Sequence, residues 1–168
     1  MSGPINNLTD VYVLELKDLY NANKQANAVT EKFIEATNNA ELKKALQRSV
    51  EGTKKGNEHI EKIAEAHGFK PTGHKCKGME GLVSEAKEHV LNQEFGDEDA
   101  RDAMMISQYQ RMAHYAITGY GCAEAFAKRL GHSSDAEALK KCKEQTKDGD
   151  LTFTEIAEGG VNKDAMAA

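Results

Sequence analysis

Cysteine and proline are scarce in this chain of 168 residues. The three cysteines, Cys76, Cys122 and Cys142, are an odd number at wide spacing and form no Cys-x-x-Cys pair, so neither a zinc site nor a thioredoxin-like couple is indicated. We expect free thiols in a reducing compartment. The two prolines, Pro4 and Pro71, lie outside the long periodic segments, so proline breaks none of the expected helices.

Long apolar runs and an excess of positive charge are also missing. No segment approaches the roughly 20 apolar residues of a membrane span, and Met1 is not followed by the basic segment and apolar core of a signal peptide. The 22 basic and 27 acidic residues give a net charge of −5 and are spread evenly, without a basic stripe that could follow a phosphate backbone. We predict a cytoplasmic protein that binds neither membrane nor nucleic acid.

The sequence motifs of common enzymes are absent as well. The chain has no Gly-x-Ser-x-Gly elbow, no phosphate-binding loop and no dinucleotide fingerprint. Its glycines are scattered through expected helices or turns and do not follow strands. The sequence therefore shows no classical nucleophile.

Apolar and small residues recur at steps of three and four along most of the chain, which is typical of amphipathic helices. We predict an all-α fold, a ferritin-like four-helix bundle with a fifth, shorter C-terminal helix. The expected helices span about residues 8–37, 41–67, 75–94, 99–130 and 133–148. Glycines and a proline predict a turn at 68–73. One domain covers 1–168, with the ordered bundle at about 8–158 and tails at 1–7 and 159–168.

The segment 99–130 is the helix around which the others are expected to pack. At 1.5 Å per residue it is about 45 Å long, so only comparably long helices can bury its inward stripe. Dimetal bundle proteins carry carboxylates at the centre of such a stripe. Here the centre holds Ala113 and Ala116 around His114 and Tyr115, so a metal centre of that type is not predicted.

Two polar residues stay as candidates at the edge of the core. Glu80 is either a core-edge carboxylate or an acid that favours the dipole at the start of its helix. His114 is a ligand, a proton donor or a packed aromatic side chain. The residues leave these alternatives open.

Four glycines, Gly52, Gly56, Gly119 and Gly121, lie inside expected helices. Each costs about 0.5–1 kcal/mol relative to alanine, so something must offset the cost. One explanation is close contact between two helices. The other is a central space that holds water or a small ligand, lined by Tyr20, Asn23, Thr53, Tyr109 and Tyr120.

Several short motifs point to one known family. They are Tyr20-Asn21-Ala22-Asn23-Lys24-Gln25, Lys75-Cys76, Met79-Glu80-Gly81-Leu82, Arg101-Asp102-Ala103, His114-Tyr115 with Tyr120-Gly121, and Val161-Asn162. Across nearly its whole length the chain resembles the YciE/YciF-type ferritin-like family of bacterial stress-associated proteins. The resemblance implies a ferritin-like bundle, a homodimer and induction in general or osmotic stress.

The chain departs from the pattern of that family at the metal positions. The family commonly has Glu where this chain has Asn23, and an acid followed by His or Gln where it has Gly52 and Gly56. An acid of the third helix is replaced by Ser84, and Glu-His-Tyr-Glu of the central helix reads Ala113-His114-Tyr115-Ala116. Because the acids are lost on all four helices, no metal ligand is carried over and no cofactor is expected.

Three functions remain open. The first is a non-enzymatic stress-response protein, structural or binding a small molecule, with a central cavity in place of the metal site. The second is an iron or manganese oxidase, peroxidase or catalase-like enzyme with non-standard ligands such as Glu58, Glu80 and His114. The third is an oligomerising module that lacks the cavity. The pocket candidates are Tyr20, Asn23, Gly52, Thr53, Gly56, Glu80, Ser84, Tyr109, Ala113, His114, Ala116 and Tyr120.

Overall fold

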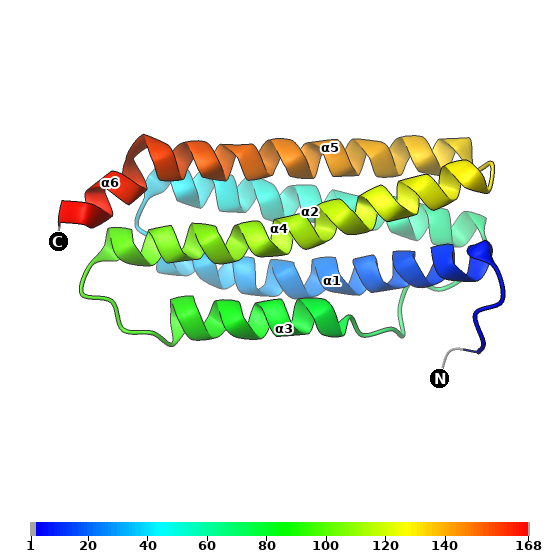
Figure 1. The fold of residues 1–168 in the computed structure, drawn as a ribbon, viewed down its shortest axis with the longest axis horizontal. Coiled ribbons are helices and arrows are strands. Elements are labelled where there is room, and N and C mark those ends of the chain that lie inside the picture. Colours follow the sequence, from blue (N-terminus) through cyan, green and yellow to red (C-terminus); the bar gives the residue numbers. More distant parts are fainter. Residues whose placement is uncertain (1–2, 168) are drawn as a thin grey trace.

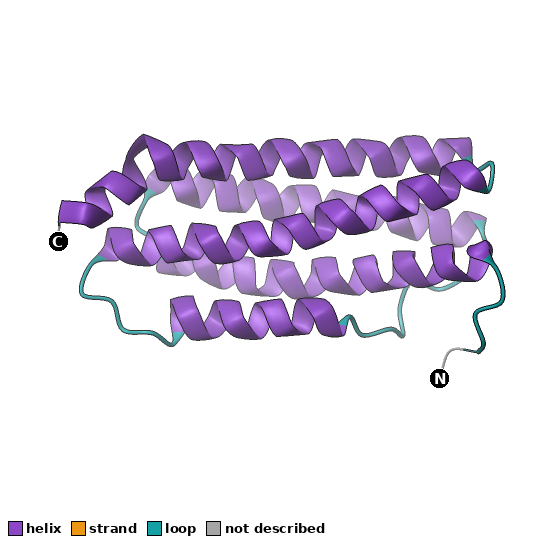
Figure 2. Ribbon diagram, viewed as in Figure 1, coloured by secondary structure: helices purple, strands orange, loops and turns teal. Residues whose placement is uncertain are grey.

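Helices make up nearly all of the computed structural model, which describes residues 3–167. The four long helices are α1 (Leu8–Ala36), α2 (Ala40–Ala66), α4 (Glu98–Arg129) and α5 (Ser133–Ile156). They run side by side, and the short α3 (Lys77–Ala86) lies beside them (Figure 1). The described residues contain no strand (Figure 2), so the predicted all-α fold is confirmed. None of the helices in this part of the chain is long and apolar enough to cross a membrane.

Each of the four long helices packs against two of the others. Helix α1 packs against α2 and α4, and α5 packs against the other sides of the same two helices. Three-residue connections at 37–39 and 130–132 join α1 to α2 and α4 to α5. Because such short loops place consecutive helices antiparallel, the bundle consists of two helical hairpins.

The four helices that form the bundle are not the four that the sequence predicts. The sequence predicts a bundle helix at 75–94, but α3 has 10 residues and packs outside, against α1 and α4, together with the π-helical turn η1 (Lys87–Leu91). The sequence also predicts that the fifth helix stops at Gly149, but α5 has 24 residues and completes the bundle. Burial explains the difference, because Phe153 and Ile156 are buried and outweigh the roughly 1 kcal/mol that a helical glycine costs.

Polar side chains fix where three of the long helices begin. Asn7, Asn39 and Asp97 each accept a hydrogen bond from a backbone N–H in the first turn of α1, α2 and α4. These bonds satisfy donors that have no partner within the helix. For α1 this cap is Asn7, whose side chain accepts from the backbone N–H of Asp10.

The C-terminal segment is helical where the sequence predicts a frayed tail. After α5 come the π-helical turn η2 (Ala157–Val161), the short α6 (Asn162–Asp164) and the 3₁₀ turn η3 (Ala165–Ala167). Val161 is 2% exposed and packs into the core. Residues 159–167 are therefore helical, and residue 168 lies outside the described residues.

Two clusters of buried apolar side chains fill the bundle. One gathers around Leu46 and Phe153, and the other around Leu16 and Leu139. The buried Asn23 of α1 lies where the two clusters meet, and it marks a layer of polar side chains across the bundle. This layer positions the site described next.

Candidate functional site: a cleft into the centre of the bundle

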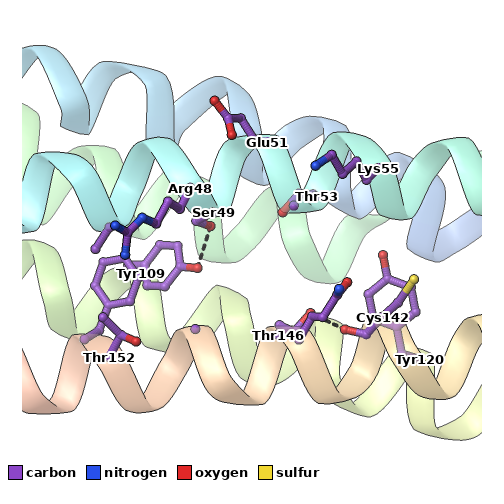
Figure 3. Close-up of a pocket in the computed structure, with 15 residues that line it drawn as sticks. Arg48, Ser49, Glu51, Thr53, Lys55, Tyr109, Tyr120, Cys142, Thr146 and Thr152 are labelled. Atoms are coloured by element: carbon purple, nitrogen blue, oxygen red, sulfur yellow. Dashed lines mark hydrogen bonds between the residues drawn. The ribbon is translucent and has the colours of Figure 1, made fainter.

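A cleft between α2 and α5 leads toward the centre of the bundle (Figure 3). Its volume is about 320 Å³, and Tyr109 and Tyr120 line it from α4. Gly52 of α2 and Gly149 of α5 also line it, and no atom lies within 4 Å of the position that a Cβ would take at either glycine. The absence of side chains at these two positions keeps the cleft open.

A smaller cavity, of about 30 Å³, continues from the cleft into the polar layer. A water molecule needs roughly 10–15 Å³ of such space, so the cavity has room for one or two waters. The residues that line both spaces are Ser49, Thr53, Tyr109, Tyr120 and Thr146. Those that line only the inner cavity are Asn23, Ala26, Asn27, Thr30, Met112, Ala113 and Ala116.

Neutral hydrogen bonds hold the inner end of this space. The side-chain amide of Asn23 donates to Asn57 Oδ1 at 2.9 Å and to the Tyr120 hydroxyl at 3.0 Å. The Asn57 amide in turn donates to the backbone carbonyl of Tyr20 at 3.2 Å. Both amide protons of Asn23 are thus used, as a buried amide requires. Burial also raises the pKa of Tyr120, so the network carries no charge at neutral pH.

Gly56 makes room for one member of this network. A Cβ at this position would lie 2.2 Å from the Tyr120 hydroxyl oxygen, which is closer than any non-bonded contact allows. Tyr120 comes from α4 and is 3% exposed. Glycine at 56 therefore has a packing reason, whereas glycine at 52 faces open space.

Tyr109 forms an aromatic wall of the cleft. Its ring stacks on Phe153 with centroids 3.9 Å apart and an angle of 25° between the planes. Its hydroxyl shares a hydrogen bond with Ser49 at 2.5 Å. Burial raises the pKa of Tyr109 to about 12, so the wall offers a neutral phenol and an aromatic face.

The sulfur in the cleft is also uncharged. Cys142 is buried, and desolvation raises the pKa of its thiol to about 11. The thiolate is the nucleophilic form of cysteine, so this thiol is unreactive at neutral pH. Charged side chains occur at the rim, where Arg48, Glu51 and Lys55 are exposed.

Seven of the predicted pocket residues line the cleft or its inner cavity. They are Asn23, Gly52, Thr53, Tyr109, Ala113, Ala116 and Tyr120. Gly56 is adjacent, through its contact with Tyr120. The structure therefore brings residues of α1, α2 and α4 together as the helical stripes predict.

The other four predicted residues lie elsewhere. Tyr20 donates a hydrogen bond to Glu61 at 2.6 Å in an exposed position. Glu80 and Ser84 are exposed on α3, because that helix lies outside the bundle. His114 has a side chain that is 66% exposed and pairs with Asp150 at 2.9 Å. Their placement in a central pocket is therefore corrected.

The prediction leaves out Asn57, which hydrogen-bonds to Asn23, and the cleft residues of α5. Asn57 belongs to a second stripe on α2, adjacent to the stripe through Gly56, that runs through Leu46, Val50, Thr53, Asn57, Ile60 and Ala64 at steps of four and three. On α5, Cys142, Thr146, Gly149 and Phe153 follow the same steps. Both patterns are visible in the sequence, but the prediction that α5 ends at Gly149 conceals the second.

The residues of the cleft do not fit a dimetal centre. Such centres need several carboxylates pointing inward, and the inner cavity is lined by none. Glu124 is buried in α4, but its two oxygens bind Lys128 and Lys143 at 2.5 Å each, and the pKa of Glu124 is lowered by these hydrogen bonds. The exposed Glu58 and Glu80 lie on α2 and on the outer helix α3, so they do not converge with His114.

Comparison with known proteins identifies relatives across almost the whole chain. The model of a domain of unknown function, DUF892, matches residues 7–166. Protein YciF of Escherichia coli is 35% identical over 159 residues, which cover 94% of this chain and 95% of that protein.

Two solved structures share the fold. The crystal structure of the E. coli stress protein YciF matches with a TM-score of 0.88 and 33% identity, over 95% of this chain and 99% of that chain. YcfI from Rhodopseudomonas palustris matches with a TM-score of 0.85 and 28% identity, over 92% of this chain and 97% of the other. The resemblance found in the motifs is confirmed, and the chain belongs to the DUF892 family, together with YciF.

Proposed function

We propose that this chain is a non-enzymatic, ferritin-like stress-response protein that binds a small uncharged molecule in the cleft between α2 and α5. The observation that carries the proposal is the chemistry of the cleft, in which amides, hydroxyls, a neutral thiol and aromatic rings replace the acids of a metal centre. The role in stress rests on the similarity to the E. coli stress protein YciF.

The shape and lining of the cleft favour a small aromatic ligand. A volume of about 320 Å³ is at the lower end of the roughly 300–1,000 Å³ that ligand pockets span. The stacked rings of Tyr109 and Phe153 offer an apolar wall, and Ser49, Thr53 and Thr146 offer hydroxyl groups. A single ring with one or two hydrogen-bonding groups matches both features.

Amide NMR of the full-length chain, titrated with phenol and with indole, tests the ligand class. We expect saturable shifts at residues of α2 and α5 that border the cleft. Gly52→Leu places a side chain in the cleft at a position where a Cβ has no atom within 4 Å, and it should weaken binding at least tenfold.

Gly81→Leu is the matched control, because Gly81 is also helical and has no atom within 4 Å of its Cβ position, but lies exposed on α3. The control should bind like the unchanged protein. Absence of saturable shifts with both probes, or equal binding by Gly52→Leu, overturns the proposal.

The homodimer implied by the resemblance is also part of the proposal. Light scattering after size-exclusion chromatography should give twice the chain mass of 18.4 kDa. A mass of one chain at micromolar concentration contradicts it.

A further inference from the structure

One end of the bundle carries a cluster of ionisable side chains that the cleft does not use. His67 follows the last turn of α2, His132 precedes α5, and Asp135 lies in the first turn of α5. One potential donor atom from each of these residues lies within 4.8 Å of the other two. Among residues 3–167 this is the one group of three His, Cys, Asp or Glu side chains that comes so close together.

The backbone holds the two histidines in place. Gly68 and Gly131 both have positive φ, of +70° and +79°, a conformation that glycine adopts without strain. These glycines end α2 and α4 with tight turns. The backbone N–H of His67 bonds to the Ile63 carbonyl at 3.0 Å, and that of His132 bonds to the Ala127 carbonyl at 2.9 Å. The ring centroids of the histidines are consequently only 4.4 Å apart.

Asp135 is oriented by two partners. Its Oδ2 accepts a hydrogen bond from the hydroxyl of Tyr12 at 3.1 Å and lies 2.7 Å from His67 Nε2. Tyr12 is 1% exposed, and the Asp135 residue is 8% exposed. A buried carboxylate with a second hydrogen-bonding partner is the arrangement that supports metal ligands in proteins.

The distances suit a small transition-metal ion. Zinc binds imidazole nitrogen and carboxylate oxygen at about 2.0–2.2 Å, which places tetrahedral donors about 3.3–3.5 Å apart. That separation lies between the 2.7 Å of His67 and Asp135 and the 4.8 Å limit of the cluster. His67 is partly exposed, with 28% of its side chain accessible, so an ion has a path from solvent.

From this geometry we propose that His67, His132 and Asp135 bind one divalent transition-metal ion of the zinc class. Two imidazoles and one carboxylate suit zinc, cobalt, nickel or copper, whereas magnesium and calcium prefer all-oxygen sites. The ion ties the end of α2 to the turn between α4 and α5, and Tyr12 of α1 positions Asp135. The site lies outside the cleft and does not depend on its ligand.

Cobalt and zinc titrations of the untagged full-length chain test the site. We expect one ion per chain, a cobalt spectrum of low-symmetry coordination that zinc abolishes, and a rise in the unfolding temperature on adding zinc. His67→Gln and His132→Gln should each weaken binding at least tenfold. Tyr12→Phe, which changes a positioning residue, should weaken it by a smaller factor.

His114→Gln is the matched control. His114 also pairs with an aspartate, Asp150, at 2.9 Å, but 15 residues along α5 from Asp135, which is about 22 Å. The control should bind cobalt like the unchanged protein. In the unchanged protein, zinc should shift the imidazole nitrogen resonances of His67 and His132, which keeps the test valid if a variant fails to fold.

Three results would overturn the proposal. They are no stoichiometric cobalt or zinc binding, binding that His67→Gln and His132→Gln leave unchanged, and zinc-induced shifts at other histidines instead of these two.

Discussion

The centre and the end of the bundle both bury a tyrosine hydroxyl, but they give it different partners. In the centre Tyr120 meets the amide of Asn23, and at the end Tyr12 meets the carboxylate of Asp135 beside His67. The centre is enclosed by four helices, so an unpaired charge there would be expensive. The end is partly open to solvent, where charge is tolerated. The difference shows that the bundle places neutral polar side chains at its centre and ionisable side chains at its end.

The largest expected effect on the free energy of unfolding comes from placing a charge in the centre of the bundle. Asn23→Asp removes the donors to Asn57 and Tyr120 and buries a carboxylate without a cation, which should cost about 3–5 kcal/mol at pH 7. Burial raises the pKa of the new carboxyl above its unfolded value, so the cost should shrink as the pH falls below that pKa. Urea unfolding at pH 7 and pH 4 measures the loss of stability and its decrease at low pH.

Asn21→Asp is the control for this change. Asn21 lies two residues away on α1, and its Oδ1 accepts from the Gln25 amide and from the backbone N–H of Cys76. A carboxylate oxygen keeps both acceptor roles, so we expect a much smaller loss. Similar losses for the two variants would show that the centre does not discriminate against charge.

A smaller effect is expected from the two glycines of α2. Gly56→Ala forces its Cβ against the Tyr120 hydroxyl and should cost about 1–3 kcal/mol. Gly52→Ala meets no atom and should gain up to about 1 kcal/mol from helix propensity. Thermal unfolding compares them, and adding Tyr120→Phe to Gly56→Ala should recover part of the loss. Equal effects at 52 and 56 would contradict the packing described for Gly56.

The smallest expected effect on stability at neutral pH comes from the ionisation of the tyrosines. Burial raises the pKa of Tyr109 to about 12, and burial together with the charge of Asp135 raises that of Tyr12. A raised tyrosine pKa contributes stability that is complete below about pH 10, the unfolded value, and is lost as the pH rises through the folded value. Stability should therefore fall above pH 10. Tyrosinate absorbance should appear at a higher pH in the folded protein than in the unfolded chain. Early titration of most of the tyrosines would refute this.

Much of the fold follows from the sequence. Periodicity and turn residues predict α1, α2 and α4 to within a few residues, because long amphipathic helices are the strongest signal in a single chain. The inward positions of Asn23, Gly56 and Ala113 follow from the same stripes. The neutral character of the polar layer could therefore be predicted before the structure.

The rest depends on which helices pack together. The pattern of α3 is as apolar as that of a bundle helix, so only the packing shows that Glu80 and Ser84 lie outside. Gly149 looks like a helix end, but burial on both sides of it continues α5. The cluster of His67, His132 and Asp135 joins positions that are far apart in the sequence, and no local spacing predicts it.

The cleft between α2 and α5 has a consequence for how the protein folds and opens. Helices α1 and α2 form one hairpin and α4 and α5 the other, each closed by a three-residue connection, so contacts within each hairpin are local and form fast. The cleft lies on the seam where the hairpins meet. Transient separation along this seam would admit a guest molecule, and a bound guest would couple the two halves into one cooperative unit.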